Sequence, residues 1–163
     1  MKPAVRPIRI LFVCLGNICR SPTAQGVFLH YVREAGLENE IVIDSAGTGD
    51  YQIGCPPDPR ACSAAAQRGY DVSGHIARQV TREDFAEFDY VLAMDEENLR
   101  ALKRLCAAEH VRKVRLFTEF SSKGASAVPD PYIGGPEGFE LVLDLVEDAA
   151  RGLLLHVRRQ LNA

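Results

Sequence analysis

The sequence predicts an α/β protein in which helices cover both faces of a four-stranded parallel sheet. Short apolar runs alternate with longer segments of helical spacing, an order that is typical of parallel sheets. The 163 residues are enough to bury one core, and no linker, repeat or low-complexity tract divides them, so residues 1–163 are expected to form a single domain. The expected strands are residues 8–13, 40–44, 90–94 and 114–117.

The first expected strand leads into a loop and then a helix. Gly16 and Asn17 interrupt the apolar run, and Ser21 and Pro22 suit the N-cap and the first position of a helix. Gly36 is placed to end that helix. Because free amides at a helix N-terminus favour an anion, we expect an anion-binding loop after the first strand.

The remaining elements are predicted from capping pairs and from apolar residues at helical spacing. An Asp-Pro pair at 58–59 should open a second helix that ends near Gly69. Residues 45–57 and 121–138 have the composition of loops. The other expected helices are a short one capped by Thr81 and Asp84, one that follows Asp95, and a final one over residues 139–161.

Three of the expected strands end at polar or nucleophilic side chains. Cys14 follows the first strand, Ser45 ends the second, and Asp95 follows the third. Ligands of parallel sheets bind beyond the carboxyl ends of the strands. We therefore expect these three segments to meet at one edge of the sheet and to form the functional site there.

Composition argues against several classes of partner. The formal net charge of -3 provides no basic field for nucleic acid, and no apolar run is long enough to span a bilayer. The apolar core of residues 10–15 is too short for a signal peptide, so a cytoplasmic location is expected. The five cysteines and four histidines lack ligand spacing, so neither a metal site nor a disulfide framework is predicted.

The loop after the first strand contains the residue types needed for phosphate chemistry. The backbone amides of residues 15–20, here called the phosphate loop, would turn inward around a tetrahedral oxyanion, which Gly16 permits. Arg20 adds a bidentate fork that matches phosphate geometry. Cys14 at the floor of this loop would be a thiolate, placed for in-line attack on phosphorus without a metal ion.

Such a reaction also needs an acid for the leaving oxygen, and Asp130 is the candidate. Prolines at 129 and 131 restrict the backbone on both sides of Asp130. A group held in this way suits proton transfer, first as the acid and then as the base for the hydrolytic water. Residues 129–132 are called the acid segment below.

These residues match a known family. The Cys-x5-Arg-Ser pattern at 14–21, together with Asp-Pro-Tyr at 130–132, closely resembles the low-molecular-weight protein tyrosine phosphatases. The resemblance continues through residues 44–47, 57–60, 75–79, 83–85 and 88–92, and so covers nearly the whole chain. It implies an enzyme without cofactor or metal that hydrolyses phosphotyrosine in protein substrates and small aryl phosphates. A monomer or weak self-association is expected.

The resemblance implies a role for each matching position. Cys14 would be the nucleophile, Arg20 the phosphate clamp and Asp130 the general acid and base. Ser21 would donate a hydrogen bond to the thiolate, and Asp95 would orient Arg20 besides serving as an N-cap. The positions expected to bind phosphate or support its loop are Leu15, Gly16, Asn17, Ile18, Cys19, Ser21, Ser45, His75 and Asp95.

Two aromatic residues are expected to contact the substrate ring. Tyr51 and Tyr132 lie where the family has aromatic walls, and Leu15 would add an apolar contact. The family often carries Trp near position 51 and a second aromatic residue after Tyr132, where this chain has Tyr51 and Ile133. The preferred substrate is therefore left open.

Two alternative functions and one alternative role were weighed. A thiol-dependent arsenate reductase would need two relay cysteines after the middle of the chain, and residues 74–101 contain none. A phosphotyrosine-binding module without activity would have lost the nucleophile or the acid, and both are present. Cys19 is either an inert packed thiol or a partner that traps oxidised Cys14 as a disulfide.

Overall fold

The computed structural model describes residues 6–163, and it contains one four-stranded parallel sheet with strand order β2-β1-β3-β4. The central strand β1 pairs with β2 up to Cys14 opposite Gly47, and with β3 up to Val13 opposite Ala93. The predicted fold class is confirmed. The strands are β1 (Ile8–Cys14), β2 (Ile41–Gly47), β3 (Tyr90–Ala93) and β4 (Val114–Leu116).

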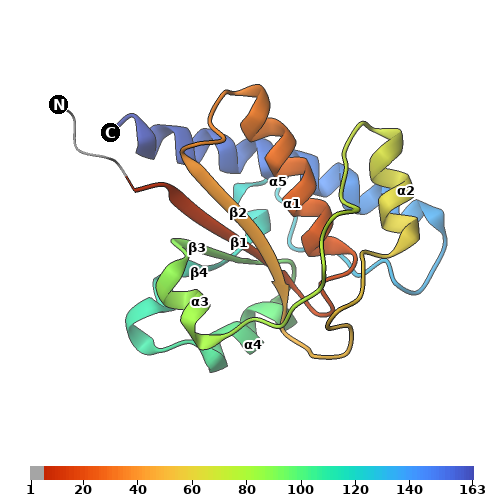
Figure 1. Ribbon diagram of the computed structural model, residues 1–163, viewed down its shortest axis with the longest axis horizontal. Coiled ribbons are helices and arrows are strands. Elements are labelled where there is room, and N and C mark those ends of the chain that lie inside the picture. The colour runs from red at the N-terminus through yellow and green to blue at the C-terminus, as the bar shows by residue number, and fades with distance from the viewer. Residues whose placement is uncertain (1–5) are drawn as a thin grey trace.

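Helices cover both faces of this sheet (Figure 1). Alternate residues of β1 point to opposite faces, so Phe12 joins one buried cluster and Val13 joins the other. The cluster around Phe12 includes residues of α1 (Arg20–Glu34) and α5 (Pro136–Leu161). The cluster around Val13 includes residues of α3 (Arg82–Glu87) and α4 (Glu96–Leu105).

Helix α2 (Pro59–Gln67) packs between the phosphate loop and the start of α5. A small buried cluster joins Cys19 of the loop, Ala61 of α2 and Phe139 of α5. Two short 3₁₀ helices, η1 (Ala108–Lys113) and η2 (Phe117–Phe120), flank β4 and were not predicted.

Several predicted helix ends are confirmed. The first helix ends beside Gly36, whose φ of 71° is the left-handed conformation that glycine adopts readily. Asp58 caps α2 by accepting a hydrogen bond from the amide of Arg60. Thr81 and Asp84 form the reciprocal capping box of α3.

Three predicted boundaries were wrong. Ser21 is not an N-cap, because α1 begins at Arg20 and the Ser21 hydroxyl is bonded to Cys14 and Asn17 instead. Strand β2 continues to Gly47, where a loop was predicted, because residues 45–47 pair with the end of β1. Helix α5 begins at Pro136 rather than at residue 139, and proline suits that first position.

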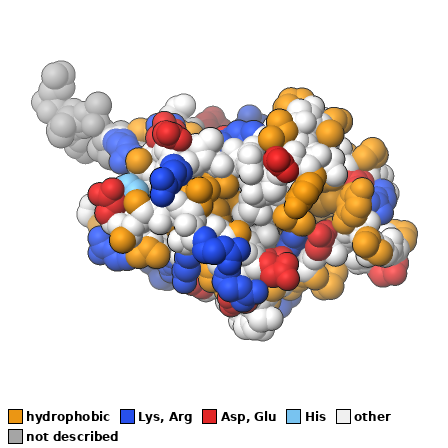
Figure 2. Space-filling view, turned by 90° about the horizontal axis from the view of Figure 1, so that it is seen from below, with side chains coloured by type: hydrophobic (Ala, Val, Ile, Leu, Met, Phe, Trp, Pro, Cys, Tyr) orange, Lys and Arg blue, Asp and Glu red, His pale blue; other side chains and the backbone are white. Residues whose placement is uncertain are grey.

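The surface mixes side chains of both charges. Figure 2 shows basic, acidic and hydrophobic side chains interspersed on one face, with hydrophobic side chains more numerous toward the end at which α2 lies in Figure 1. Within residues 6–163, no helix has both the length and the apolar character needed to cross a bilayer.

Candidate active site

A pocket of about 200 Å³ opens beyond the carboxyl end of β1. Its floor and sides are Cys14 and residues of the phosphate loop. Tyr51 and Gln52, from the segment after β2, form another side, and Asp130 and Tyr132 of the acid segment complete it. Of the three residues expected to meet at this edge of the sheet, only Cys14 lines the pocket. Ser45 and Asp95 lie next to it, bonded to Asn17 and Arg20 of the phosphate loop.

The Cys14 sulfur lies buried at the floor of this pocket with two hydrogen-bonding groups around it. The backbone amide of Asn17 donates to Cys14 Sγ over 3.3 Å, and Ser21 Oγ lies 3.1 Å from the same atom. Both groups therefore contact the sulfur from the side of the phosphate loop and the start of α1.

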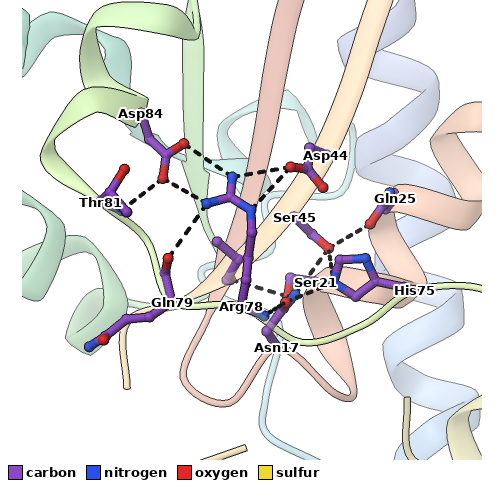
Figure 3. Close-up of polar contacts among 11 residues, drawn as sticks. Asn17, Ser21, Gln25, Asp44, Ser45, His75, Arg78, Gln79, Thr81 and Asp84 are labelled. Atoms are coloured by element: carbon purple, nitrogen blue, oxygen red, sulfur yellow. Dashed lines mark hydrogen bonds and ion pairs between the residues drawn. The ribbon is translucent and has the colours of Figure 1, made fainter. Parts of the chain in front are cut away.

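Asn17 is the centre of the polar network behind the phosphate loop (Figure 3). Its side chain is fully buried, and its φ of 58° is the left-handed conformation that asparagine tolerates. Its amide nitrogen donates to Ser21 Oγ over 2.8 Å and to Ser45 Oγ over 3.0 Å. Its amide oxygen accepts from His75 Nε2 over 2.7 Å and from the backbone amide of Arg78 over 3.0 Å.

This network determines where the Ser21 proton points. The backbone amide of Arg78 can only donate, so the bonded atom of Asn17 must be its carbonyl oxygen, and Asn17 Nδ2 must face the two serines. Ser21 Oγ therefore accepts from Asn17 and has its own proton left for Cys14 Sγ. The carbonyl oxygen of Ala46, at 3.4 Å from Ser21 Oγ, is a more distant competitor.

His75 supports the network as a neutral imidazole. Burial lowers the pKa of His75 from its ordinary value, with the nearby Arg78 acting in the same direction and Asp44 opposing. The neutral ring carries its proton on Nε2, because that atom donates to Asn17 Oδ1. Ser45 Oγ in turn donates to Gln25 Oε1 over 2.5 Å.

Arg78 and Gln25 were not singled out from the sequence. The Arg78 guanidinium forms ion pairs with Asp44 at 3.1 Å and Asp84 at 2.9 Å, which holds its backbone amide toward Asn17 (Figure 3). Arg78 lies in the 75–79 segment that shares in the family resemblance, and this resemblance was the feature of the sequence that could have indicated its role. Nothing in the sequence pointed to Gln25.

The Arg20 side chain is 3% exposed and is held by two acceptors. Arg20 Nη1 donates to Asp95 Oδ2 over 2.6 Å and to the backbone oxygen of Val128 over 3.1 Å. Asp95 also caps α4, because its other oxygen accepts from the amide of Asn98 over 2.8 Å. Asp95 thus makes both of its expected contacts, one with each carboxylate oxygen.

Asp130 lies at the mouth of the pocket with 47% of its side chain exposed. Its Oδ2 atom is 3.8 Å from Arg20 Nη2, and its Oδ1 atom accepts from the amide of Tyr132 over 3.1 Å. The backbone therefore orients the carboxyl group of Asp130 toward the pocket.

The other predicted loop residues surround the same space. Leu15, Gly16 and Ile18 line the pocket, and the exposed rings of Tyr51 and Tyr132 flank it.

Like Cys14, Cys19 also lines the pocket. Burial, followed by the charge of Asp58, raises the pKa of the Cys19 thiol to about 12. Both thiols are free in this structure. The thiolate that disulfide formation requires is therefore scarce for Cys19 at neutral pH, and the disulfide with oxidised Cys14 stays a prediction.

The end of β2 fixes the backbone of the phosphate loop. The amides of Thr48 and Gly49 donate to the carbonyl oxygens of Cys14 and Leu15, each over 2.9 Å. At Gly47 an added Cβ would lie 2.7 Å from the Leu15 oxygen, so only glycine permits this close approach. Among the described residues, no group of three or more His, Cys, Asp or Glu side chains is arranged to hold a metal ion.

Comparison with known families and sequences finds clear relatives. The model of the family described as low molecular weight phosphotyrosine protein phosphatase matches residues 9–163. A putative low molecular weight protein-tyrosine-phosphatase of Synechocystis is 47% identical and covers 94% of this chain and 99% of its own. The human low molecular weight phosphotyrosine protein phosphatase is 42% identical, covering 89% of this chain and 92% of its own.

Solved structures agree with these relatives. A protein tyrosine phosphatase from Entamoeba histolytica with Hepes in its active site superposes with a TM-score of 0.92 at 38% identity, covering 94% of this chain and 98% of that one. A low molecular weight phosphotyrosine phosphatase from Vibrio cholerae gives a TM-score of 0.87 at 36% identity, with the same coverage of each chain.

Proposed function

The chain belongs to the low molecular weight phosphotyrosine protein phosphatase family, and from that membership we propose that it hydrolyses phosphotyrosine in protein substrates through a phosphocysteine intermediate. The observation that carries the proposal is the buried Cys14 sulfur, faced by the Asn17 amide and the Ser21 hydroxyl at the floor of the pocket. Small aryl phosphates would be hydrolysed by the same steps.

In the first step the Cys14 thiolate attacks phosphorus in line with the ester oxygen. The S–P bond forms as the P–O bond to the aryl group breaks, and Asp130 gives its proton to the departing oxygen. The loop amides and Arg20 stabilise charge on the equatorial oxygens. Arg20 uses Nη1 for both of its side-chain hydrogen bonds to protein. Its Nη2 atom, 3.8 Å from Asp130 Oδ2, makes no hydrogen bond within the described residues and is left for the phosphate.

In the second step water releases the phosphate. Asp130, now ionised, takes a proton from the water molecule. The oxygen of that water bonds to phosphorus as the S–P bond breaks. The departing sulfur is stabilised as a thiolate by the Ser21 hydroxyl, whose proton the Asn17 amide directs toward it. Both steps proceed without a cofactor or metal ion.

The nucleophile is tested with Cys14→Ser and the matched control Cys62→Ser, whose side chain is outside the pocket lining. Hydrolysis of an aryl phosphate should fall to background in the first variant and stay near the native rate in the second, with and without EDTA. Undiminished turnover by Cys14→Ser would exclude the mechanism.

The acid is tested with Asp130→Ala. We expect a large loss of kcat, roughly 100-fold or more, for a poor leaving group, with most of the affinity for inorganic phosphate retained. An unchanged kcat with that substrate would mean that another residue supplies the proton.

The arsenate reductase alternative is not favoured. The family and its relatives named above are phosphatases, and residues 74–101 contain no cysteine that could relay oxidation.

A further inference from the structure

We infer that Arg60 is a positioning residue for the general acid, holding the acid segment in register with the phosphate loop. The inference rests on the proposed role of Asp130. Arg60 belongs to the 57–60 segment that shared in the family resemblance, and neither of the steps above uses it.

The Arg60 side chain is fixed at one end by Asp58. Arg60 Nε donates to Asp58 Oδ1 over 3.1 Å, and Nη2 donates to Oδ2 over 2.8 Å. These hydrogen bonds lower the pKa of Asp58, so the carboxylate stays charged. Asp58 is itself fixed as the buried N-cap of α2. A bidentate pair of this kind fixes the plane of the guanidinium as well as its position.

The same guanidinium holds the acid segment. Arg60 Nη2 donates to the backbone oxygen of Tyr132 over 3.1 Å, although the two residues are far apart in sequence. The guanidinium carbon also lies 5.5 Å from the centre of the Tyr132 ring and 4.8 Å from that of Phe139. Arg60 therefore contacts both the backbone and the ring of Tyr132, within the range of cation–π attraction.

Tyr132 transmits this constraint to the acid. Its carbonyl oxygen accepts from Arg60, and its amide donates to Asp130 Oδ1 over 3.1 Å. Prolines at 129 and 131 leave few other backbone conformations between these two bonds. A displacement of Tyr132 would therefore move or rotate the Asp130 carboxyl group.

The other end of this connection is the phosphate loop. The amide of Asp58 donates to the backbone oxygen of Ile18 over 2.8 Å. Asp58 and Arg60 thus link the loop around the nucleophile to the segment that carries the acid. Since a misplacement of about 1 Å between reacting groups costs roughly 100-fold in rate, this link bears directly on proton transfer.

A purely stabilising role would have a different signature. The Arg60 side chain is 46% exposed, and ion pairs at exposed positions contribute little to stability. Loss of the Arg60 side chain should therefore slow the hydrolysis of esters whose leaving oxygen needs a proton much more than it lowers the free energy of unfolding.

The experiment compares two leaving groups in Arg60→Gln. Phenyl phosphate needs a proton on its departing oxygen, whereas 2,4-dinitrophenyl phosphate leaves readily without one. The ratio kcat/KM reports the first step, in which that proton is used. We expect kcat/KM for phenyl phosphate to fall roughly 10- to 100-fold and that for the dinitrophenyl ester by less than about 3-fold. Arg60→Lys, which keeps the charge without the planar fork, should recover only part of the loss.

Arg68→Gln is the matched control. Arg68, the C-cap of α2, forms ion pairs with Glu140 at 2.5 Å and Glu147 at 2.7 Å on α5. It joins the same two helices as Arg60, and the hydrogen bonds and ion pairs of its side chain are to α5 rather than to the acid segment. We expect its loss to leave the ratio between the two substrates at the native value.

Asp130→Asn separates failure of this inference from failure of the proposed acid. If Asp130→Asn selectively slows phenyl phosphate and Arg60→Gln slows both substrates equally or neither, the positioning role is wrong and the acid stands. If Asp130→Asn is not selective, the acid assignment is wrong and the positioning role falls with it. Thermal melting checks folding, and if Arg60→Gln does not fold, a native substrate ratio in Arg60→Lys would overturn the inference.

Discussion

The Asn17 side chain offers the sharpest test of how the phosphate loop is held. It is fully buried, and it makes four hydrogen bonds to groups from three other segments of the chain. Asn17→Ala removes all four bonds and leaves a non-glycine residue at a φ of 58° without the local bonding that favours asparagine there.

The expected loss of stability follows from those contacts. Four hydrogen bonds at about 1 kcal/mol each give about 4 kcal/mol, and the left-handed backbone adds about 1 kcal/mol for alanine. The free energy of unfolding should therefore fall by about 5 kcal/mol. Since domains of this kind unfold with about 5–15 kcal/mol, this loss is at least about a third of the total stability.

Urea unfolding followed by circular dichroism measures this difference directly. Asn17→Gly is the matched variant, because it loses the same bonds while glycine tolerates the positive φ, and it should differ from Asn17→Ala by at most about 1 kcal/mol. A loss below about 2 kcal/mol in Asn17→Ala would refute the view that this side chain holds the loop.

Three further predictions concern the loop, its network and its thiols. A Cβ at Gly47 would lie 2.7 Å from a backbone oxygen of the phosphate loop, so Gly47→Ala should weaken inhibition by inorganic phosphate about tenfold. Gly36→Ala, at a site open to solvent, should leave this inhibition unchanged. Equal inhibition constants for Gly47→Ala and the native protein would contradict the prediction. Burial lowers the pKa of His75, so as pH falls below about 6.5 the unfolded chain binds a proton that the folded chain does not. The free energy of unfolding should therefore decline more between pH 7.5 and 5.5 in the native protein than in His75→Gln. Parallel declines in the two proteins would count against a buried neutral His75. Mild peroxide should convert Cys14 to a sulfenic acid, and the Cys19 thiolate should attack its sulfur, forming the S–S bond as hydroxide leaves. The reaction should be faster at higher pH because the pKa of Cys19 is about 12. Peptide mass spectrometry that finds no Cys14–Cys19 bond would remove this role.

The features predicted correctly from the sequence are mostly local. The caps at Asp58 and Gly36 depend on contacts within a few residues, and the strand–loop–helix order around Cys14 depends on neighbouring residues. Periodic apolar residues indicate which face of an element is buried, whatever lies opposite. Local signals of this kind, together with the family resemblance, were sufficient for the fold class.

The wrong boundaries have non-local causes. Residues 45–47 have the composition of a loop, yet they are a strand because β1 lies beside them. Serine is a residue type that favours N-caps, yet the hydroxyl of Ser21 is bonded to Cys14 and Asn17 across the loop. In both cases a partner brought close by folding outweighed the local preference.

The sequence by itself determined which residues we propose for the chemistry, and only the tertiary structure decided how they are held. Cys14 and Arg20 are spaced for a loop that binds phosphate, and that spacing is visible in any conformation. The bond from Arg20 to Val128 spans 108 positions and the one from Arg60 to Tyr132 spans 72, so neither leaves a local pattern. Contacts of this kind depend on how the sheet and helices pack, because packing alone brings such distant backbone atoms within hydrogen-bonding distance.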